Sequence, residues 1–373
     1  MPGAESKIIV IADDLSGAAE IAGIAFAHGL SAEVQRQFEA ASTAQVIAVD
    51  TDSRDVAAAG AAQQLRAITE QILAAGPDCV FKKVDSLLRG NVRGEIEAVL
   101  DVIGHRRAIL IPANPSRGRV IAKGRYLIDG VPLDRTSFAI DSNHPRRSAD
   151  IRELLGDAGE LHVQLIAKDE SLPDDGIIVP DIATVLDIER YVHDTGRETL
   201  LAGAADCFAA LLELQLKRRP VAGPPVPIVP PALLVCGSRA SWVARRADCD
   251  ASRIPVTALG ESGGGVLDGA LALGLGERQL ADAASLLHSS LPRLIDFFLT
   301  NSKVKTLLIE GGATAAAVAE YFGWTRFAVT AWAPAGVGVL RPLADHAPLV
   351  LIKPGSYAWP EEIWQAFVAC RDG

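Results

Sequence analysis

The sequence lacks the features that define several large protein classes. Its five cysteines are widely spaced and form no CxxC pair, so neither a disulfide framework nor a cysteine zinc site is indicated. A net charge of −10 leaves no basic surplus for a nucleic-acid backbone. No apolar run approaches the roughly 18 residues of a membrane span, and no cationic start precedes a long apolar stretch. We therefore expect a cytoplasmic protein that binds neither nucleic acid nor membrane.

The usual fingerprints of nucleotide and metal sites are also missing. No GxxxxGK[ST] or GxGxxG string occurs, which argues against a P-loop NTPase and against the usual dinucleotide fold. The seven histidines show no HExxH or other metal spacing, so we assign no metal ligands. What remains is a chain of 373 residues with 22% charged residues, typical of a globular protein of two domains.

Strands alternate with helices along the chain. A β-branched run at 7–12 is followed by a helical pattern at 18–28. The same order of strand and helix patterns repeats through the first half and again after residue 231. Such alternation predicts an α/β fold with mostly parallel sheets flanked by helices. Six prolines fall within 217–231, which we interpret as a linker between domains at 1–216 and 232–373.

Four polar clusters in the first half directly follow predicted strands. They read ADDLSG at 12–17, DTDSR at 50–54, KKVDSLLRGN at 82–91 and PANPSRGR at 112–119. In a parallel sheet the carboxyl ends of the strands share one edge, where ligands bind. Together the clusters offer cations for an acidic group and carboxylates for hydroxyls, a mixture that suits a small polyhydroxylated anion. Taken singly, each cluster also reads as a helix cap, a turn or a solvated loop.

The second half contains two glycine turns between a strand and a helix. VCGSRAS at 235–241 includes Gly237 and Ser238, and IEGGATAAAV at 309–318 includes Gly311, Gly312 and Thr314. Glycine permits close backbone approach, and the helix that follows presents free N–H groups to a phosphate. Tight strand-to-helix turns need glycine in any case, so one such turn is weak evidence for a phosphate site. Two in the same half are stronger evidence.

These motifs, together with GRYLIDGVPL at 124–133 and KPGSY at 353–357, resemble in order and spacing the four-carbon acid sugar kinase family, which includes threonate, erythronate and 3-oxo-tetronate kinases. The resemblance implies a two-domain kinase with a sugar-acid site in the N-terminal domain, ATP and Mg²⁺ in the C-terminal domain, and an active-site cleft between them. The implied sugar-acid residues are Asp13, Asp14, Arg54, Lys83, Asp85, Ser86, Arg89 and Asn91. The implied nucleotide residues are Gly237, Ser238, Gly311, Gly312, Thr314, Gly336 and Gly355.

Phosphoryl transfer needs positioning, charge neutralisation and an acid that orients or deprotonates the acceptor hydroxyl. For that last role we favour Asp85 or Asp13, with Lys83 and Arg89 holding the substrate carboxylate or the transferring phosphoryl group. Mg²⁺ would be carried mostly by ATP oxygens and water.

Three departures from the family pattern lie in the second half. Ala313 stands where the family has an acid after the glycine pair, PAGVGV at 334–339 replaces Pro-Gly-Val-Pro, and KPGSYAWP at 353–360 replaces Gly-Asn-Phe-Gly after the lysine. A sugar-acid-binding regulatory protein that has lost phosphoryl transfer is therefore an alternative, as is an enzyme that activates a carboxylate. Residue types leave the substrate stereochemistry and any homo-oligomer open.

Overall fold

The computed structural model describes residues 6–140, 144–156, 159–168, 170–196, 198–224, 226–237, 239–259, 267–275, 283–334 and 336–371. The chain forms two compact units. Unit 1 comprises Met1–Asp13, His28–Leu30 and Phe38–Pro220, and unit 2 comprises Asp14–Ala27, Ser31–Gln37 and Val221–Gly373. Each unit has a sheet flanked by helices.

The units do not follow the predicted boundary of 1–216 near the N-terminus. Helix α1 (Leu15–Ala27) and strand β2 (Ala32–Gln35) pack with unit 2, where β2 pairs antiparallel with β16 (Arg326–Val329). Close packing of α1 on β17 (Gly338–Pro342) depends on glycine, because a Cβ on Gly23 would lie 3.0 Å from the Val337 carbonyl oxygen. Sequence periodicity identifies this helix but does not show which sheet it covers.

The unit 1 sheet is parallel throughout its described strands. Its order is β3 (Val46–Asp50), β1 (Ile8–Ala12), β4 (Cys79–Lys83), β11 (Thr199–Gly203), β5 (Arg107–Ile111), β10 (Gly176–Pro180) and β9 (Val163–Ile166). Most of these strands are buried apolar runs, as expected for strands covered on both faces. Ala12 pairs in register with both Asp50 and Lys83, so three of the polar clusters begin side by side.

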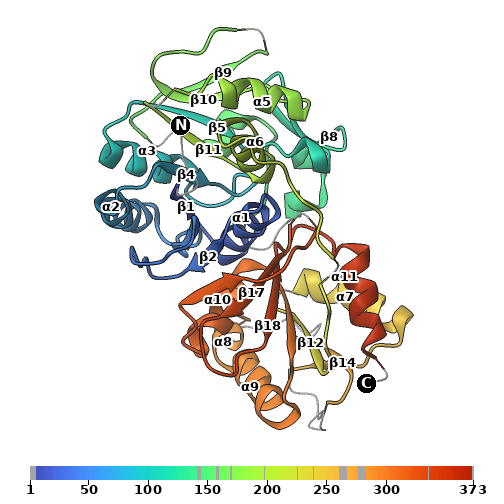
Figure 1. Ribbon diagram of the computed structural model, residues 1–373. Coiled ribbons are helices and arrows are strands. Elements are labelled where there is room, and N and C mark those ends of the chain that lie inside the picture. Colours follow the sequence, from blue (N-terminus) through green and yellow to red (C-terminus); the bar gives the residue numbers. More distant parts are fainter. Residues whose placement is uncertain are drawn as a thin grey trace. The chain divides into compact units, whose positions relative to one another are not determined.

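Helices cover both faces of this sheet because right-handed crossovers in opposite directions place them on opposite sides. Figure 1 shows α2 (Ala58–Ala74) beside α3 (Val92–Ile103), and α5 (Val185–His193) beside α6 (Ala205–Gln215) on the other side of the strands. The segment between β5 and β9 adds a small antiparallel sheet, β6 (Arg119–Ala122), β7 (Arg125–Ile128) and β8 (Val131–Pro132). The same segment also contains helix α4 (Ile151–Leu155) and three short 3₁₀ helices, at Pro115–Arg117, Leu133–Arg135 and Ser137–Ile140.

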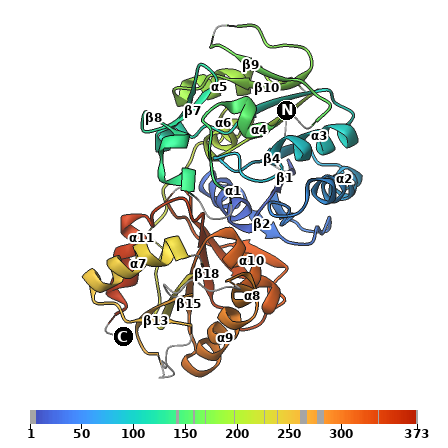
Figure 2. The ribbon, with the colours of Figure 1, turned by 180° about the vertical axis from the view of Figure 1, so that it is seen from behind.

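The unit 2 sheet is mixed. Strands β13 (Val256–Ala258), β14 (Ala270–Gly274), β12 (Ala232–Cys236), β15 (Thr306–Glu310) and β18 (Leu349–Lys353) run parallel in that order, and β17, β16 and β2 continue it antiparallel. Helices α8 (Ala283–His288), α9 (Ser290–Ser302) and α10 (Gly312–Tyr321) pack together on one side. Helices α7 (Arg239–Ser252) and α11 (Glu361–Ala369) lie on the other, as Figure 2 shows from behind.

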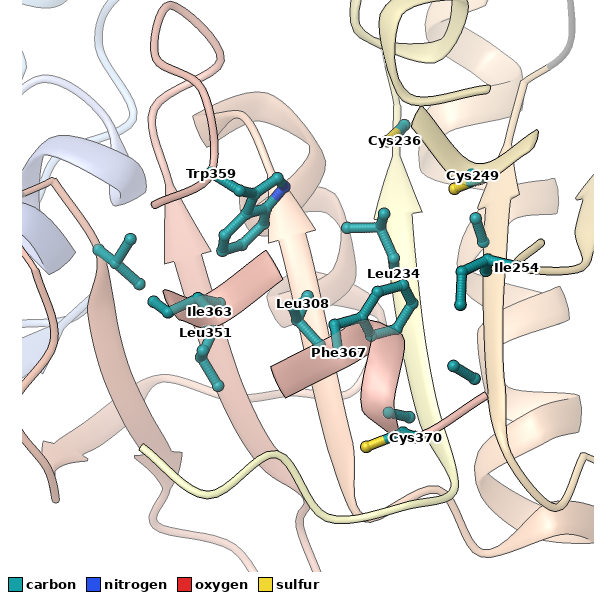
Figure 3. Close-up of a cluster of buried hydrophobic side chains, with 14 of the residues drawn as sticks. Leu234, Cys236, Cys249, Ile254, Leu308, Leu351, Trp359, Ile363, Phe367 and Cys370 are labelled. Carbon is teal, nitrogen blue, oxygen red and sulfur yellow. The ribbon is translucent and has the colours of Figure 1, made fainter. Parts of the chain in front are cut away.

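The apolar core of unit 2 lies between the parallel strands and the α7–α11 side. Figure 3 shows Phe367 and Ile363 of α11 facing Leu234, Leu308 and Leu351 of the strands. Trp242 of α7 belongs to the same cluster and packs so tightly on Gly274 that a Cβ there would collide with the indole ring.

The predicted α/β class with mostly parallel strands flanked by helices is confirmed. A site in a cleft between two domains remains a prediction. Within the described ranges, no helix combines the length and apolar character needed to cross a membrane.

Replacing Phe367 by alanine should lower the free energy of unfolding of unit 2 by about 3–5 kcal/mol, because the ring is fully buried and its loss leaves a cavity. All five tryptophans belong to unit 2, so urea denaturation followed by tryptophan fluorescence reports on it. Leu343→Ala is the control, since that side chain is 55% exposed and should change stability by less than about 0.5 kcal/mol. Equal losses in the two variants would contradict this assignment of the core.

Candidate functional site

The polar side chains that follow β1 and β3 in unit 1 form a buried ion pair. The Arg54 guanidinium donates from Nε to Asp13 Oδ2 at 2.7 Å and from a terminal nitrogen to Asp13 Oδ1 at 3.0 Å. The backbone helps, because the N–H groups of Ser53 and Arg54 donate to the Asp13 carbonyl. A bidentate arginine–carboxylate pair of this kind fixes orientation as well as charge.

A second pair follows β4, and Arg54 joins the two. Arg89 donates from Nε to Asp85 Oδ2 at 2.9 Å and from a terminal nitrogen to Asp85 Oδ1 at 2.7 Å. A terminal nitrogen of Arg54 lies 3.7 Å from Asp85 Oδ1. We call Asp13, Arg54, Asp85 and Arg89 the Asp–Arg cluster. Both carboxylates are buried, and the arginine side chains are only 13% and 15% exposed.

The arginines keep both aspartates ionised. Burial alone would raise the pKa of Asp85, but the nearby Arg89 and Arg54 guanidinium groups outweigh it and hold the pKa well below its ordinary value of 3.8. For Asp13, the opposing effects of burial and of Arg54 likewise leave the pKa lowered. These carboxylates therefore stay ionised, so they can accept hydrogen bonds, but they are weak bases.

Beneath the cluster lies a buried pair that sequence reasoning missed. Lys82 Nζ lies 2.9 Å from Glu95 Oε2 of α3 and also donates to the carbonyl oxygens of Lys83 and Ile11. Glu95 Oε1 accepts from Ser53 Oγ at 2.6 Å. The pair thus connects β1, β4, α3 and the loop after β3. The sequence signal was weak: a lysine doublet at the end of an apolar strand and a glutamate in the first turn of the helix that follows.

Three more of the predicted sugar-acid residues lie around the cluster. Lys83 Nζ donates to the Val84 carbonyl at 3.0 Å, Ser86 Oγ bonds to Arg119, and Asn91 Nδ2 donates to the Val56 carbonyl at 2.8 Å. The Asn91 contact ties the loop after β4 to the loop after β3.

The segment around His144, which the sequence left without a role, also reaches these loops. His144 Nε2 lies 2.6 Å from Asp55 Oδ1, and Arg146 donates to the Leu88 carbonyl at 2.9 Å. Leu88 has a positive φ of 56°, so Arg146 holds an unusual bend of the loop that carries Arg89.

In unit 2, most of the predicted nucleotide residues come together. Gly311, with φ of 98°, turns the chain from β15 into α10, and its N–H donates to the Lys353 carbonyl at 2.9 Å. A Cβ on Gly237, which follows β12, would collide with Thr314 Oγ1. The two glycine turns are therefore neighbours. Ser238 lies outside the described residues.

Asp14 lies at this turn. Its Oδ1 accepts from the Gly17 N–H and its Oδ2 accepts from Ser16 Oγ, so it caps α1 as an N-terminal carboxylate does. The same carboxylate occupies the space that a Cβ on Gly312 would need. The sequence grouped Asp14 with Asp13 for the sugar acid, but the structure places its side chain against a predicted nucleotide residue.

Gly336 and Gly355 occupy separate loops of unit 2. Gly336 has φ of 91° and lies in the loop before β17, while Gly355 is exposed in the loop after β18. In the part of the chain that the structure describes, no group of three or more histidine, cysteine or acidic side chains is arranged to hold a metal ion.

Comparison with known proteins decides the family. The model of the sugar-binding N-terminal domain matches residues 8–211. The chain belongs to this family. The match covers the Asp–Arg cluster and every predicted sugar-acid residue, and it ends before the proline-rich segment.

Curated relatives agree with the resemblance drawn from the motifs. A D-threonate kinase of Salmonella typhimurium is 29% identical over 262 residues, which are 65% of this chain and 60% of that protein. A 3-oxo-tetronate kinase of Methylobacterium radiotolerans is 25% identical over 405 residues, covering 93% of this chain and 95% of the relative. The chain thus spans about three fifths of the first relative's length. The predicted relationship to the four-carbon acid sugar kinase family is confirmed.

A solved structure supports the fold along the whole chain. A putative tRNA synthase from Salmonella typhimurium LT2 is 17% identical, with a TM-score of 0.73 and coverage of 98% of this chain and 99% of that one. The likeness extends through both units.

Gly90→Ala should disturb the Asp–Arg cluster. Gly90 has φ of 83°, and a Cβ there would lie 3.0 Å from Arg54 Cγ and 3.2 Å from the Arg54 carbonyl oxygen. We expect a loss of at least about 1 kcal/mol in unfolding free energy, measured by scanning calorimetry. Gly94→Ala in α3 is the matched control, because its Cβ would meet nothing within 4 Å and alanine favours a helix. The same destabilisation in both variants would refute the steric argument.

The low pKa of Asp85 predicts how its contribution to stability depends on pH. Because the folded pKa lies below 3.8, the ionised carboxylate stabilises the fold at neutral pH, and this contribution is lost as pH falls below 3.8 through the folded pKa. At pH 7, Asp85→Asn should lower the unfolding free energy by about 2–3 kcal/mol. The difference from wild type should shrink in calorimetry as pH falls from about 5 to 3.

Asp101→Asn is the control for this series. Asp101 pairs with Arg66 on the surface, with side chains 55% and 48% exposed, so little effect at any pH is expected. A pH-independent cost for Asp85→Asn would show that its charge is not what stabilises the site.

Proposed function

We propose that the protein is an ATP-dependent kinase that phosphorylates a hydroxyl group of a four-carbon sugar acid of the threonate, erythronate or 3-oxo-tetronate type. The observation that carries the proposal is the Asp–Arg cluster at the carboxyl ends of β1, β3 and β4, the edge where parallel sheets bind ligands. The relatives named as kinases of such acids support it.

The charge of the site suits an acidic substrate. The cations around the cluster are Arg54, Arg89, Lys83 and Arg119, and they outnumber the two carboxylates of Asp13 and Asp85. A sugar acid brings one carboxylate, which these cations can bind. Arginine recognises that group well, because its planar donors match the two carboxylate oxygens.

The aspartates would bind and orient hydroxyl groups. With its pKa held low, Asp85 accepts a hydrogen bond from a hydroxyl and aligns the oxygen for attack, but it is a poor acceptor of the whole proton. That is sufficient for phosphoryl transfer, in which positioning and charge stabilisation supply most of the rate. Asp13 would play the same part for a neighbouring hydroxyl.

Unit 2 has residues that fit a nucleotide. The turn at Gly311 and Gly312 opens α10, whose first N–H groups have no partner within the helix and favour a phosphate. Mg²⁺ takes phosphate oxygens, water and one or two carboxylates, and Asp14, against Gly312, would supply a carboxylate here. When bound, Mg²⁺ would neutralise charge on the phosphate oxygens.

The direct test is an ADP-release assay with threonate, erythronate and 3-oxo-tetronate stereoisomers. Turnover of one of them with ATP and Mg²⁺ is the expected result. Silence with all acids and nucleotides would refute the kinase proposal. Calorimetry then identifies the alternative, because sugar-acid binding without any nucleotide binding would favour a regulatory protein that has lost phosphoryl transfer.

Within this assay, Arg89→Met should lower kcat/KM for the sugar acid at least about 100-fold, because it removes a charge and leaves Asp85 without its bidentate partner. Arg66→Met is the control, since Arg66 forms an exposed pair on α2 and should leave kcat/KM unchanged. Loss of activity in both variants, or in neither, would contradict the assignment of Arg89 to the substrate site.

A further inference from the structure

Unit 2 contains a buried ion pair between two residues of the quoted motifs to which the sequence assigned no role. Glu310 is the last residue of β15 and Lys353 the last residue of β18, and the two are register partners in neighbouring parallel strands. Lys353 Nζ lies 3.0 Å from Glu310 Oε1, and the side chains are 1% and 3% exposed. Both charges lie at the edge of the sheet where α/β proteins bind ligands.

Lys353 holds the loop that follows β18. Besides its bond to Glu310, the ammonium group donates to the Pro354 carbonyl at 3.1 Å and to the Tyr357 carbonyl at 2.6 Å. These three contacts match the three donors of an ammonium group. The loop they fix contains Gly355, one of the residues expected to approach the nucleotide.

Glu310 contacts Trp359 after this loop, Arg245 of α7 and the start of the glycine turn. Its Oε2 accepts from the Trp359 indole N–H at 3.1 Å and lies 3.5 Å from Arg245 Nε of α7. Glu310 also directly precedes Gly311, whose N–H donates to the Lys353 carbonyl. One ion pair therefore connects the glycine turn at the start of α10 with the loop after β18.

The surroundings make a purely structural role costly. Figure 3 shows Trp359 and Cys236 towards the carboxyl ends of the strands, next to an apolar cluster that includes Leu351. Burying two charges among such side chains carries a large desolvation cost, and apolar replacements often leave stability unchanged or higher. Burial lowers the pKa of Lys353, opposed chiefly by Glu310, so the ammonium charge depends on this partner.

We propose that Glu310 and Lys353 are positioning residues for the nucleotide: together they hold the Gly311–Gly312 turn and the loop after β18 in the arrangement that binds the phosphates of a nucleoside triphosphate. This inference rests on the proposed kinase function. Arg245 of α7 lies beside Glu310 and also pairs with Asp248, so its guanidinium ties α7 to the same arrangement.

Two variants test the pair. Glu310→Gln keeps the shape and removes the charge, and the double variant Glu310→Leu with Lys353→Met replaces the pair by apolar side chains that should preserve folding. We expect KM for ATP and the calorimetric Kd for ATP with Mg²⁺ to rise at least about tenfold in both, with KM for the sugar acid within about twofold of wild type. If the pair served only to stabilise the fold, KM for ATP would not rise while KM for the sugar acid stayed unchanged.

The control is Glu33→Gln, which breaks another ion pair of unit 2, between Glu33 of β2 and Arg326 of β16. It should leave KM for ATP unchanged. If the double variant folds and binds ATP as wild type does, the positioning role is wrong although the kinase proposal stands. If wild type itself binds no nucleotide in calorimetry, the kinase proposal fails and this inference fails with it.

Discussion

The Asp–Arg cluster depends on the position of one guanidinium group, that of Arg54. Asp13 and Asp85 are both buried, and the Asp85 charge raises the pKa of Asp13, so a cation between them favours the ionised state of both. Arg54 lies against both carboxylates, at 2.7 Å from Asp13 and 3.7 Å from Asp85. It reaches them because β1 lies between β3 and β4 with their carboxyl ends in register. The position of Arg54 also requires glycine at residue 90, because a Cβ there would crowd the Arg54 backbone.

The convergence of the polar clusters in unit 1 could be predicted from the sequence, because it depends only on the order of strands and helices. Each polar cluster follows an apolar strand, and parallel strands bring their carboxyl ends together, so convergence follows from the order of elements. Which side chains pair could not be predicted, since this depends on register and rotamers. Asp14 shows the limit most clearly: it is the neighbour of Asp13 in sequence, yet its carboxylate lies against Gly312, about 300 residues further on.

The buried pairs were missed for a related reason. Glu310 and Lys353 are 43 positions apart, and each looks like a polar residue at the point where a strand ends. A signal was present, because the apolar runs TLLIE and LVLIK end in opposite charges. Lys82 and Glu95 carry a weaker one, a lysine doublet before a helix with glutamate in its first turn. Pairing such residues requires the strand order, which periodicity does not supply.

Both units share one device at the carboxyl ends of their strands. In each, a fully buried lysine at the end of a strand bonds to a buried glutamate and to backbone carbonyls of the adjoining loop or strand. The lysine donates to carbonyl oxygens at this edge of the sheet, and the glutamate carboxylate pairs with its ammonium group. The polar loops that begin at this buried edge are thus tied to the strands by side-chain bonds. For the proposed kinase activity this would matter, because both substrates would be anions and transfer requires groups held in place before they bind. In the proposed mechanism, Lys82 supports the loops around the sugar acid and Lys353 supports those around the phosphates. The two halves then meet the same electrostatic demand with the same pair of residue types.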